Sequence, residues 1–445
     1  MHTLRIMKHR LLFATGLLVL LNGHFAQGQS AAGLQFVQQD VLFGGARYIG
    51  MGGALSAVGH DAGAVSDNPA LGTVYRVGQL EGSLAQTVAN GNARFGVPNL
   101  AYTHIFQTGS TRWALGGSVM QNNMTTGTWS RKADDGKSWV GRWLDQAEGN
   151  NAGELMGLGL TDVYQAYYTY ILDQDPATLA WIPGAQGVPS FGEQTVRWTE
   201  KGFQQMVHGS VRSEHFSAGV SVEAAQRTRS LRSEVQEGGF SSTGWIGSWS
   251  WDTEETTRWT GWRTRMGAWW NPEGGPWRFG LAWRGIGFGS LRDSATSLMD
   301  AQSISSSVVV TPIKVVDKTE EAWNAPGQVT LSAAHVFGRD GLVSLEGRVN
   351  TLGQWEARTG GELRRGAWSY RAGYRYVPNT TGFFDWDGMQ QGSLGVGVRG
   401  NKWFLDAAWQ ATYRRAQYTS AQWDGAWNLP MVATRAMLTL GYRIR

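Results

Sequence analysis

The feature that most constrains this chain is a strict alternation of apolar and polar side chains with a period of two. In AWSYRAGYRYVP (367–378), Trp368, Tyr370 and Tyr374 fall on one face, whereas Arg371 and Arg375 fall on the other. A β-strand places successive side chains on opposite faces in this way. The same pattern recurs in WFLDAAWQATY (403–413) and in MLTLGYRIR (437–445). The chain is therefore predicted to be all-β.

About fourteen alternating runs of roughly ten residues can be placed, the length that a tilted strand needs to cross hydrocarbon. We expect strands near 77–88, 96–107, 111–122, 203–212, 214–224, 256–270, 276–290, 327–337, 341–351, 355–365, 366–377, 391–400, 402–414 and 432–445. The links NPEGGP (271–276) and GRDG (338–341) are typical of short turns at one end. The longest connection, 123–202, is expected at the other end, with a helix over the mouth within 155–174.

Two antiparallel architectures use such strands. A secreted sandwich turns the apolar face to a core, whereas a transmembrane barrel turns it to lipid and keeps a polar interior. The apolar faces here are rich in Trp and Tyr near strand ends, and the opposite faces repeatedly carry Arg beside Gly. These features favour a transmembrane antiparallel β-barrel of about 14 strands, with a large periplasmic or secreted all-β protein as the alternative.

The amino-terminal residues have the plan of a secretory signal peptide. Basic residues precede the apolar run LLFATGLLVLL (11–21), and small residues follow it, so we expect a signal peptide over 1–28. Beyond it no uninterrupted apolar stretch approaches 18 residues, which excludes helical membrane spans. The leader contains three of the 39 Lys and Arg, so 36 basic residues then face 35 acidic ones. This balance does not support a nucleic-acid partner.

The segment GARYIGMGGALSAVGHDAGAVSDNPALG (45–72) has neither a helical nor a strand period. A barrel of about fourteen strands has a lumen too wide for side chains alone to fill. We therefore expect residues 29–76 to fold inside the lumen as an N-terminal hatch, and residues 77–445 to form the barrel with its long extracellular loops. Asn68 and Pro69 are predicted to fix a turn of this hatch, because Asn bonds to its own backbone two residues on and Pro fixes φ; the alternative is that they merely shape a loop.

This segment resembles the hatch of the long-chain fatty-acid transporter (FadL) family of outer-membrane proteins. The residues that carry the likeness are Met51, Gly52, Gly53 and Ala54, then Gly59, Asp61 and Ala62, then Asn68, Pro69 and Ala70. The family usually has an aromatic residue before Asn-Pro-Ala, where this chain has Asp67.

The resemblance implies a multi-pass barrel in the outer membrane of a Gram-negative bacterium, in contact with outer-membrane lipid. It implies passive uptake of a hydrophobic small-molecule ligand, such as a fatty acid, a hydrocarbon or a heme-like compound, by hatch movement and lateral release. The gate residues that it implies are Gly50, Gly52, Gly53, Asp61, Asn68, Pro69 and Ala70. The fold resemblance also covers a shuttle protein of the type IX secretion system. A non-transporting subunit of a secretion or envelope-assembly machine, with an envelope protein partner, is therefore the alternative function.

Three tryptophans of GWIGSWSWDTEETTRW (244–259) lie in a predicted outward loop. Trp245, Trp249 and Trp251 could form a capture groove for an apolar ligand, or they could only mark the membrane interface.

No catalytic pattern accompanies these features. The chain has no cysteine and no Gly-x-Ser-x-Gly elbow, and its histidines have no short metal-ligand spacing. We expect no enzyme activity, no cofactor and no metal.

Overall fold

The computed structural model describes residues 42–89, 91–132, 138–240, 244–378, 385–419 and 426–444. The predicted signal peptide (1–28) and the first part of the predicted hatch (29–41) lie outside the described residues. Strands dominate the rest. In the described part of the chain, no helix is both long and apolar enough to cross a bilayer.

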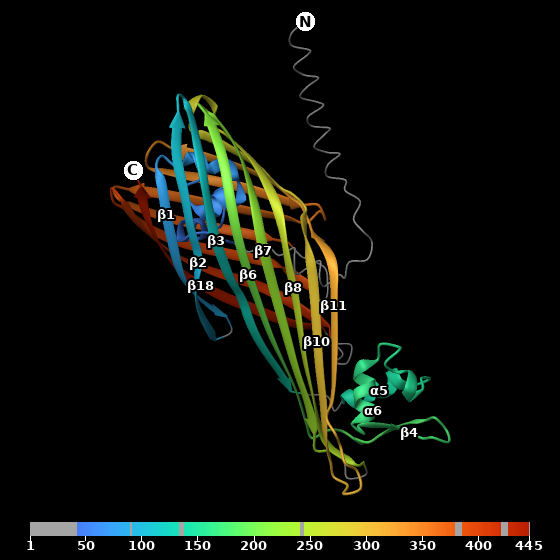
Figure 1. Cartoon of the computed structure of the whole chain (residues 1–445). Coiled ribbons are helices and arrows are strands. Elements are labelled where there is room, and N and C mark those ends of the chain that lie inside the picture. The colour runs from blue at the N-terminus through green and yellow to red at the C-terminus, as the bar shows by residue number, and fades with distance from the viewer. Residues whose placement is uncertain are drawn as a thin grey trace.

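Fourteen antiparallel strands of the described chain close into one ring (Figure 1). Strands β1 and β18 close the ring between the two ends of the chain, with Gly78 opposite Ile444. The order around the ring is β8-β7-β6-β3-β2-β1-β18-β17-β16-β15-β14-β13-β12-β9, and β9 returns to β8. The bounds are β1 (Gly78–Ala89), β2 (Asn92–Thr108), β3 (Thr111–Lys132), β6 (Phe191–Ser213), β7 (Phe216–Gly238), β8 (Ile246–Trp270), β9 (Trp277–Arg284), β12 (Gln328–Phe337), β13 (Gly341–Asn350), β14 (Trp355–Arg365), β15 (Trp368–Val377), β16 (Asp385–Arg399), β17 (Trp403–Thr419) and β18 (Ala426–Ile444). Each predicted run overlaps one of these strands, so the predicted barrel is confirmed.

The ring has a short-turn end and a long-loop end. The short turns include 109–110 between β2 and β3, and 338–340 between β12 and β13. The predicted turn after β8 contains the 3-10 helix η3 (Pro272–Gly274). The carboxyl end of β18 lies at this same end, because it pairs with the start of β1.

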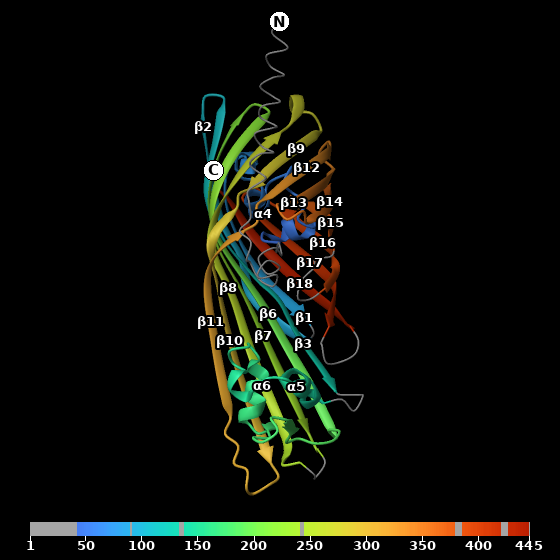
Figure 2. The same cartoon turned by 90° about the vertical axis from the view of Figure 1, so that its right-hand side faces the viewer.

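Strand β8 has different partners along its length. Its last residues, Arg265–Trp270, pair with β9, whereas 246–262 pair with β10 (Gly287–Ser303). Strand β10 in turn pairs with β11 (Ile313–Ala325). The predicted strand 276–290 is therefore broken at 285–286, and β11 is separated from β12 at 326–327. On its far side β11 has no partner strand among the described residues, and Figure 2 shows it as a free edge.

One side of the barrel is much taller than the other. Strands β3, β6, β7 and β8 have 22, 23, 23 and 25 residues, whereas β12, β13 and β15 have 10. We call the parts of β3, β6, β7, β8, β10 and β11 that rise beyond the ring the extended wall. Because β3 runs to Lys132 and β6 begins at Phe191, the connection predicted over 123–202 is shorter than expected. The lengths predicted for these strands were too short, because outside the apolar band polar residues occupy both faces and the alternation is lost.

The connection between β3 and β6 folds into a small unit that we call the loop cap (138–190). It contains α5 (Trp139–Ala147), the 3-10 helix η2 (Ala152–Glu154), α6 (Thr161–Tyr168), and a hairpin of β4 (Leu172–Gln174) and β5 (Trp181–Pro183). Helix α6 confirms the helix predicted within 155–174. The loop cap packs on the extended wall through one buried apolar cluster (Figures 1 and 2).

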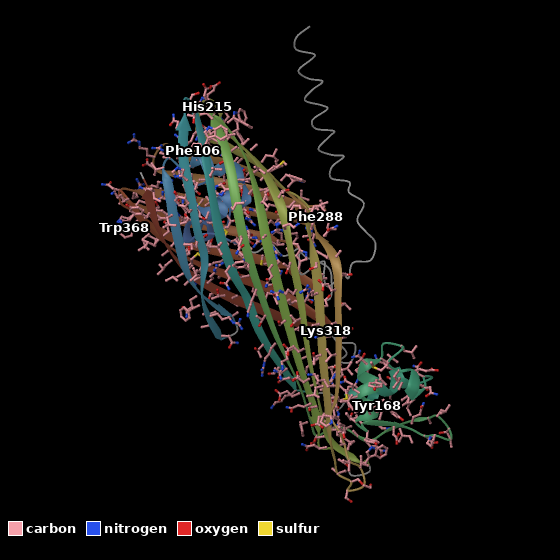
Figure 3. All side chains as sticks on the ribbon, in the orientation of Figure 1. Phe106, Tyr168, His215, Phe288, Lys318 and Trp368 are labelled. Atoms are coloured by element: carbon pink, nitrogen blue, oxygen red, sulfur yellow. The ribbon has the colours of Figure 1, made fainter. Side chains whose placement is uncertain are left out.

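The two faces of the barrel wall follow the period-two pattern. On β15, Trp368 and Tyr370 are each 50% exposed on the outside, whereas Arg371 and Arg375 are buried inside. Outward aromatic residues lie near both ends of the ring, and Figure 3 labels Phe106, Phe288 and Trp368 among them. This is the apolar outer band with aromatic girdles that a membrane barrel requires.

A buried segment, Leu42–Tyr75, fills the inside of the ring (Figure 1). It contains α3 (Ala46–Gly50), α4 (Ala62–Asp67) and the 3-10 helix η1 (Pro69–Val74). Helix α3 contacts β15, β16, β17 and β18, whereas η1 contacts β3, β6, β7 and β8 on the opposite side. We call these residues the luminal segment.

Candidate functional site

The luminal segment begins with a loop that Asp61 organises. The carboxylate of Asp61 accepts hydrogen bonds from the backbone N–H groups of Gly45 (3.0 Å), Tyr48 (3.1 Å) and Gly63 (2.8 Å). One side chain thus caps the start of α4 and joins it to the start of α3. Asp61 can do this because its side chain is short and directly precedes α4. The first N–H groups of a helix have no partner within the helix, so they are available to the carboxylate.

Asn68 performs the turn function predicted for it and also reaches the wall. Its Oδ1 accepts a hydrogen bond from the N–H of Ala70 at 3.2 Å, the bond to its own backbone two residues on. Its Nδ2 donates to the carbonyl oxygens of Ser56 (3.0 Å) and Ala268 on β8 (3.1 Å). Pro69 follows as the first residue of η1. The carbonyl of Ala70 accepts a hydrogen bond from Ser217 on β7 at 2.7 Å.

Glycines bring the backbone of the luminal segment against the wall. A Cβ on Gly52 would lie 2.7 Å from the backbone nitrogen of Tyr374, and one on Gly50 would lie 3.2 Å from the Cα of Gly395. Gly52 and Gly53 also have φ of 63° and 78°, which side chains rarely adopt. The wall contributes glycines at the same contacts: Gly219 against Pro69, Gly267 against Asn68, Gly280 against Ser56, Gly360 against Met51 and Gly373 against Gly52.

Asp67 lies at the centre of a cluster of buried charges. It forms an ion pair with Arg348, and its carboxylate lies 3.3 Å from Arg358 Nη1 and 3.6 Å from Arg265 Nη1. The hydroxyl of Tyr48 also donates a hydrogen bond to it. These arginines belong to β13, β14 and β8, so one carboxylate of the luminal segment connects three strands. Burial raises the pKa of Asp67, but Arg348, Arg358 and Arg265 outweigh burial and hold this pKa below its ordinary value.

The other inward charges form further buried ion pairs. Glu362 on β14 pairs with Arg47 of the luminal segment at 2.8 Å and with Arg371 on β15 at 2.7 Å. Glu223 on β7 pairs with Arg265 at 2.7 Å. Removing one partner of a buried pair typically costs 3–5 kcal/mol, because it leaves a charge buried without compensation. The luminal segment is therefore held firmly while these pairs persist.

The predicted capture tryptophans lie where the loop cap meets the extended wall. The ring of Trp249 is buried and lies 4.8 Å from that of Trp143 on α5. Trp251 is half-buried and lies 6.0 Å from the same ring, and Trp245 donates from Nε1 to the carbonyl of Tyr170 at 2.8 Å. The packing leaves partial faces of Trp245 and Trp251 accessible.

The ladder between β2 and β3 ends within the wall. It runs from the turn only to Asn99 opposite Met120, although β2 starts at Asn92 and β3 continues to Lys132. Pro98 lies next to the last pair and has no N–H to donate. A small hollow opens beside it, lined by Phe95, Pro98 and Gln121 among others. Phe95 is 77% exposed on the outside.

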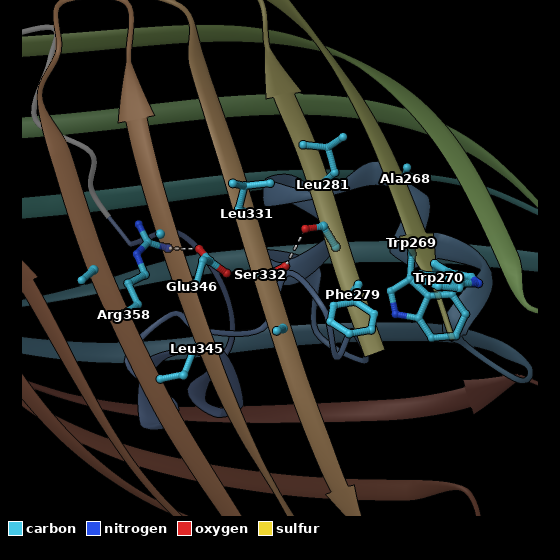
Figure 4. Close-up of a pocket in the computed structure, with 14 residues that line it drawn as sticks. Ala268, Trp269, Trp270, Phe279, Leu281, Leu331, Ser332, Leu345, Glu346 and Arg358 are labelled. Carbon is cyan, nitrogen blue, oxygen red and sulfur yellow. Dashed lines mark hydrogen bonds and ion pairs between the residues drawn. The ribbon is translucent and has the colours of Figure 1, made fainter. Parts of the chain in front are cut away.

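A hollow of about 740 Å³ lies on the outward face of β8, β9, β12, β13 and β14 (Figure 4). Leu281, Leu331 and Leu345 line it together with Trp270 and Phe279. The strand ladders are continuous at this place. It is an apolar depression on the lipid side of the wall, and the buried pair of Glu346 and Arg358 lies directly beneath it.

Sequence reasoning found the luminal turn residues but missed the charges that surround them. Asp67 entered only as a departure from a family pattern. The sequence did contain a signal for these charges, because Arg recurs at inward positions such as Arg371 and Arg375. Buried arginines need acidic partners, so acidic residues such as Asp67 could have been expected beside them. In the described part of the chain, no group of three or more acidic or histidine side chains could hold a metal ion.

Comparison with known proteins gives a likeness of fold. No family model matches the sequence, and no curated protein matches it. The toluene transporter TodX of P. putida superposes with a TM-score of 0.57 at 14% identity, covering 91% of this chain and 100% of that one. A Pseudomonas aeruginosa FadL homologue gives 0.56 at 13% identity, and the monoaromatic hydrocarbon channel CymD gives 0.53 at 12%, each covering 91% of this chain and 99% of the other.

These solved structures are transporters or channels and not enzymes. The resemblance read from the Met51–Ala70 motifs is thus confirmed at the level of fold. Because a closed barrel with a lipid-facing apolar band satisfies every spanning backbone group, it is a structure that can cross a membrane. The chain is a transmembrane-type β-barrel that has the fold of the FadL-type transporters.

Proposed function

We propose that this protein imports hydrophobic small molecules passively across the outer membrane, with the luminal segment as the hatch. The observation that carries this proposal is the way the lumen is filled. A segment of small residues occupies it and is held by hydrogen bonds, ion pairs and close glycine contacts, all of which are reversible. A filled lumen is unsuited to a water-filled pore, so passage requires the hatch to move.

Lateral release into the membrane is the exit step of this proposal. An apolar solute gains nothing from entering water, whereas a side exit transfers it from one apolar environment to another. The end of the β2–β3 ladder supports an exit there, because β2 and β3 are no longer paired with each other beyond Asn99 and Phe95 is exposed beside this place. Gly50, Gly52, Gly53, Asp61, Asn68, Pro69 and Ala70 are the gate residues of the proposal.

The ligand class is inferred from apolar chemistry and from similar proteins. Their titles name toluene and monoaromatic hydrocarbons. For this chain the proposed ligands are fatty acids, hydrocarbons or heme-like compounds. Capture would take place at the loop cap, where Trp245 and Trp251 offer partial ring faces while Trp249 supports them from within.

The test locks the hatch with an engineered disulfide, which is clean because the chain has no cysteine. The hydroxyls of Thr73 in η1 and Ser217 on β7 lie 2.7 Å apart, so Thr73→Cys with Ser217→Cys should join hatch and wall. The matched control is Ser230→Cys with Thr256→Cys, whose hydroxyls lie 3.2 Å apart on the extended wall. Uptake of radiolabelled toluene and oleate is measured in cells that lack their own carrier.

We expect the oxidised hatch variant to lose uptake and to recover it on reduction, while the control pair transports in both states. Full uptake by the oxidised hatch variant, with the cross-link verified by mass spectrometry, would refute hatch movement.

A second function is favoured by the free edge of β11. This edge lies on the extended wall, carries charged residues such as Lys318 (Figure 3), and offers unpaired backbone groups to another strand. It would suit a non-transporting subunit of a secretion or envelope-assembly machine. Native mass spectrometry of the protein extracted gently from its membrane distinguishes the two: a bound apolar molecule supports import, and a stoichiometric protein partner with an empty barrel supports the subunit.

A further inference from the structure

A polar cavity of about 490 Å³ lies at the short-turn end, between the luminal segment and the wall. Arg76, which directly follows the luminal segment, lines it together with Arg112 on β3, Arg212 on β6 and Arg278 on β9. The lining contains one acid, Glu214. The cavity therefore gathers four positive charges against one negative charge.

Two of these arginines face each other directly. Arg112 and Arg212 are partners in the antiparallel ladder of β3 and β6. Like charges at directly opposite positions destabilise a sheet. Several other inward arginines form buried ion pairs, as Arg371 does with Glu362 and Arg265 does with Glu223.

The groups that contact these guanidinium ions leave their charge uncompensated. Arg112 Nη1 reaches the carbonyl of Thr73 at 3.4 Å, and Arg212 Nε donates to the carbonyl of Glu214 at 3.0 Å. Arg212 also lies over the ring of Trp269, at 4.6 Å from its centroid. In the part of the chain that the structure describes, none of the four arginines forms an ion pair with a carboxylate.

We propose that this cavity binds the oxyanion group of a small molecule, a phosphate or a carboxylate. The planar guanidinium fork matches both groups and binds them with paired hydrogen bonds. The volume lies in the range of small-molecule pockets. An anion in contact with Arg112 and Arg212 removes their mutual repulsion, so the wall gains stability from the ligand. The inference is independent of hatch movement, because the site exists in the closed state.

The anion is either free in solution at the short-turn end or the headgroup of an amphiphile that enters from the same side. Titration calorimetry in a neutral maltoside detergent separates these sources with three probes: inorganic phosphate, octyl phosphate and octanol. The test variant is Arg112→Gln with Arg212→Gln. The matched control is Arg232→Gln with Arg292→Gln, which removes the same charge from exposed pairs on the extended wall.

We expect saturable binding of octyl phosphate that weakens as salt is raised, becomes at least tenfold weaker in the test variant, and is unchanged in the control. Comparable affinity for inorganic phosphate would identify a free anion as the ligand, and binding of octyl phosphate alone would identify an amphiphile. Equal affinities for octanol and octyl phosphate, or equal affinity of wild type and test variant, would overturn the proposal.

Melting temperatures provide a second test, which shows whether the test variant is folded and whether the anion stabilises it. Without anion, the test variant should melt at or above the temperature of the wild type, because the facing charges are gone. With octyl phosphate, the wild type should melt higher and the test variant should not shift. A test variant that loses stability without anion, or shifts as the wild type does, contradicts an anion site.

Discussion

Asp67→Asn is the substitution that most directly tests how the luminal segment is held. Asparagine keeps the shape of the side chain but removes its charge. Asp67 has a side chain only 10% exposed and contacts Arg348, Arg358 and Arg265 on three different strands. The variant leaves the barrel ladders intact and removes the negative charge that joins them to the luminal segment.

The magnitude follows from the partners that remain. Breaking a buried ion pair from one side costs about 3–5 kcal/mol. Here Glu346 still pairs with Arg348 and Arg358, and Glu223 still pairs with Arg265, so the lower figure applies. A loss of about 3 kcal/mol corresponds to an increase of about two orders of magnitude in the population with the luminal segment released.

Hydrogen exchange measured by mass spectrometry is the assay. Amides of 46–74 should exchange about a hundredfold faster in Asp67→Asn, while amides of β14 and β15 keep their wild-type rates. Because the pKa of Asp67 is held below its ordinary value, its stabilisation is present above the unfolded pKa of about 3.9 and is lost as pH falls further. The difference between the variant and the wild type should therefore be constant from pH 5 to pH 8.

The control is Asp252→Asn, which breaks the exposed pair with Arg232 on the extended wall. It should cost less than about 1 kcal/mol and should leave exchange of the luminal segment unchanged. Wild-type protection of 46–74 in Asp67→Asn would show that the ion pairs of Asp67 do not hold the luminal segment.

Three further predictions concern the same segment. Gly373→Ala places a Cβ against the backbone of Gly52 and should destabilise the closed state by about 1–3 kcal/mol. The control Gly392→Ala has nothing within 4 Å of the added Cβ and should keep the wild-type stability. The melting temperatures of the two variants test this difference. Burial, with Arg47 next in effect, holds the pKa of His60 well below its ordinary value, so stability should fall as pH drops below the unfolded pKa of about 6.5. The loss should develop between pH 7.5 and 5.5, and His60→Asn, which tolerates the φ of 63° at this position, should abolish this part of the pH dependence of melting. Asn68→Ala removes bonds to Ser56 and Ala268 and should raise ion leakage through liposomes; leakage at the wild-type level would argue against a gate role.

The strands could be read from the sequence because their period is local. Each alternating run indicates which side chains face lipid and which face the lumen. On β15, for example, Trp368 faces lipid and Arg371 faces the lumen. The turn of the luminal segment was also local, since Asn68 bonds to a residue two positions away. The helix α5 was missed although Ser138 caps it and its apolar residues have helical spacing.

No local sequence pattern indicates the break between β9 and β10. Which residues β8 pairs with depends on the closure of the ring, so the fork of the sheet and the free edge of β11 could not be predicted. The extended wall was likewise hidden, because alternation of apolar and polar residues weakens where both faces meet water.

The class of fold, the faces of the strands and the turn of the luminal segment follow from the amino-acid sequence alone, because each depends on neighbours a few residues apart. Which charges meet depends on how the whole chain folds. Asp67 and Arg348 lie 281 positions apart, and Arg112 faces Arg212 because of the register of two strands. Period two assigns a side chain to a face but carries no information about register, and register is set when the whole ring closes.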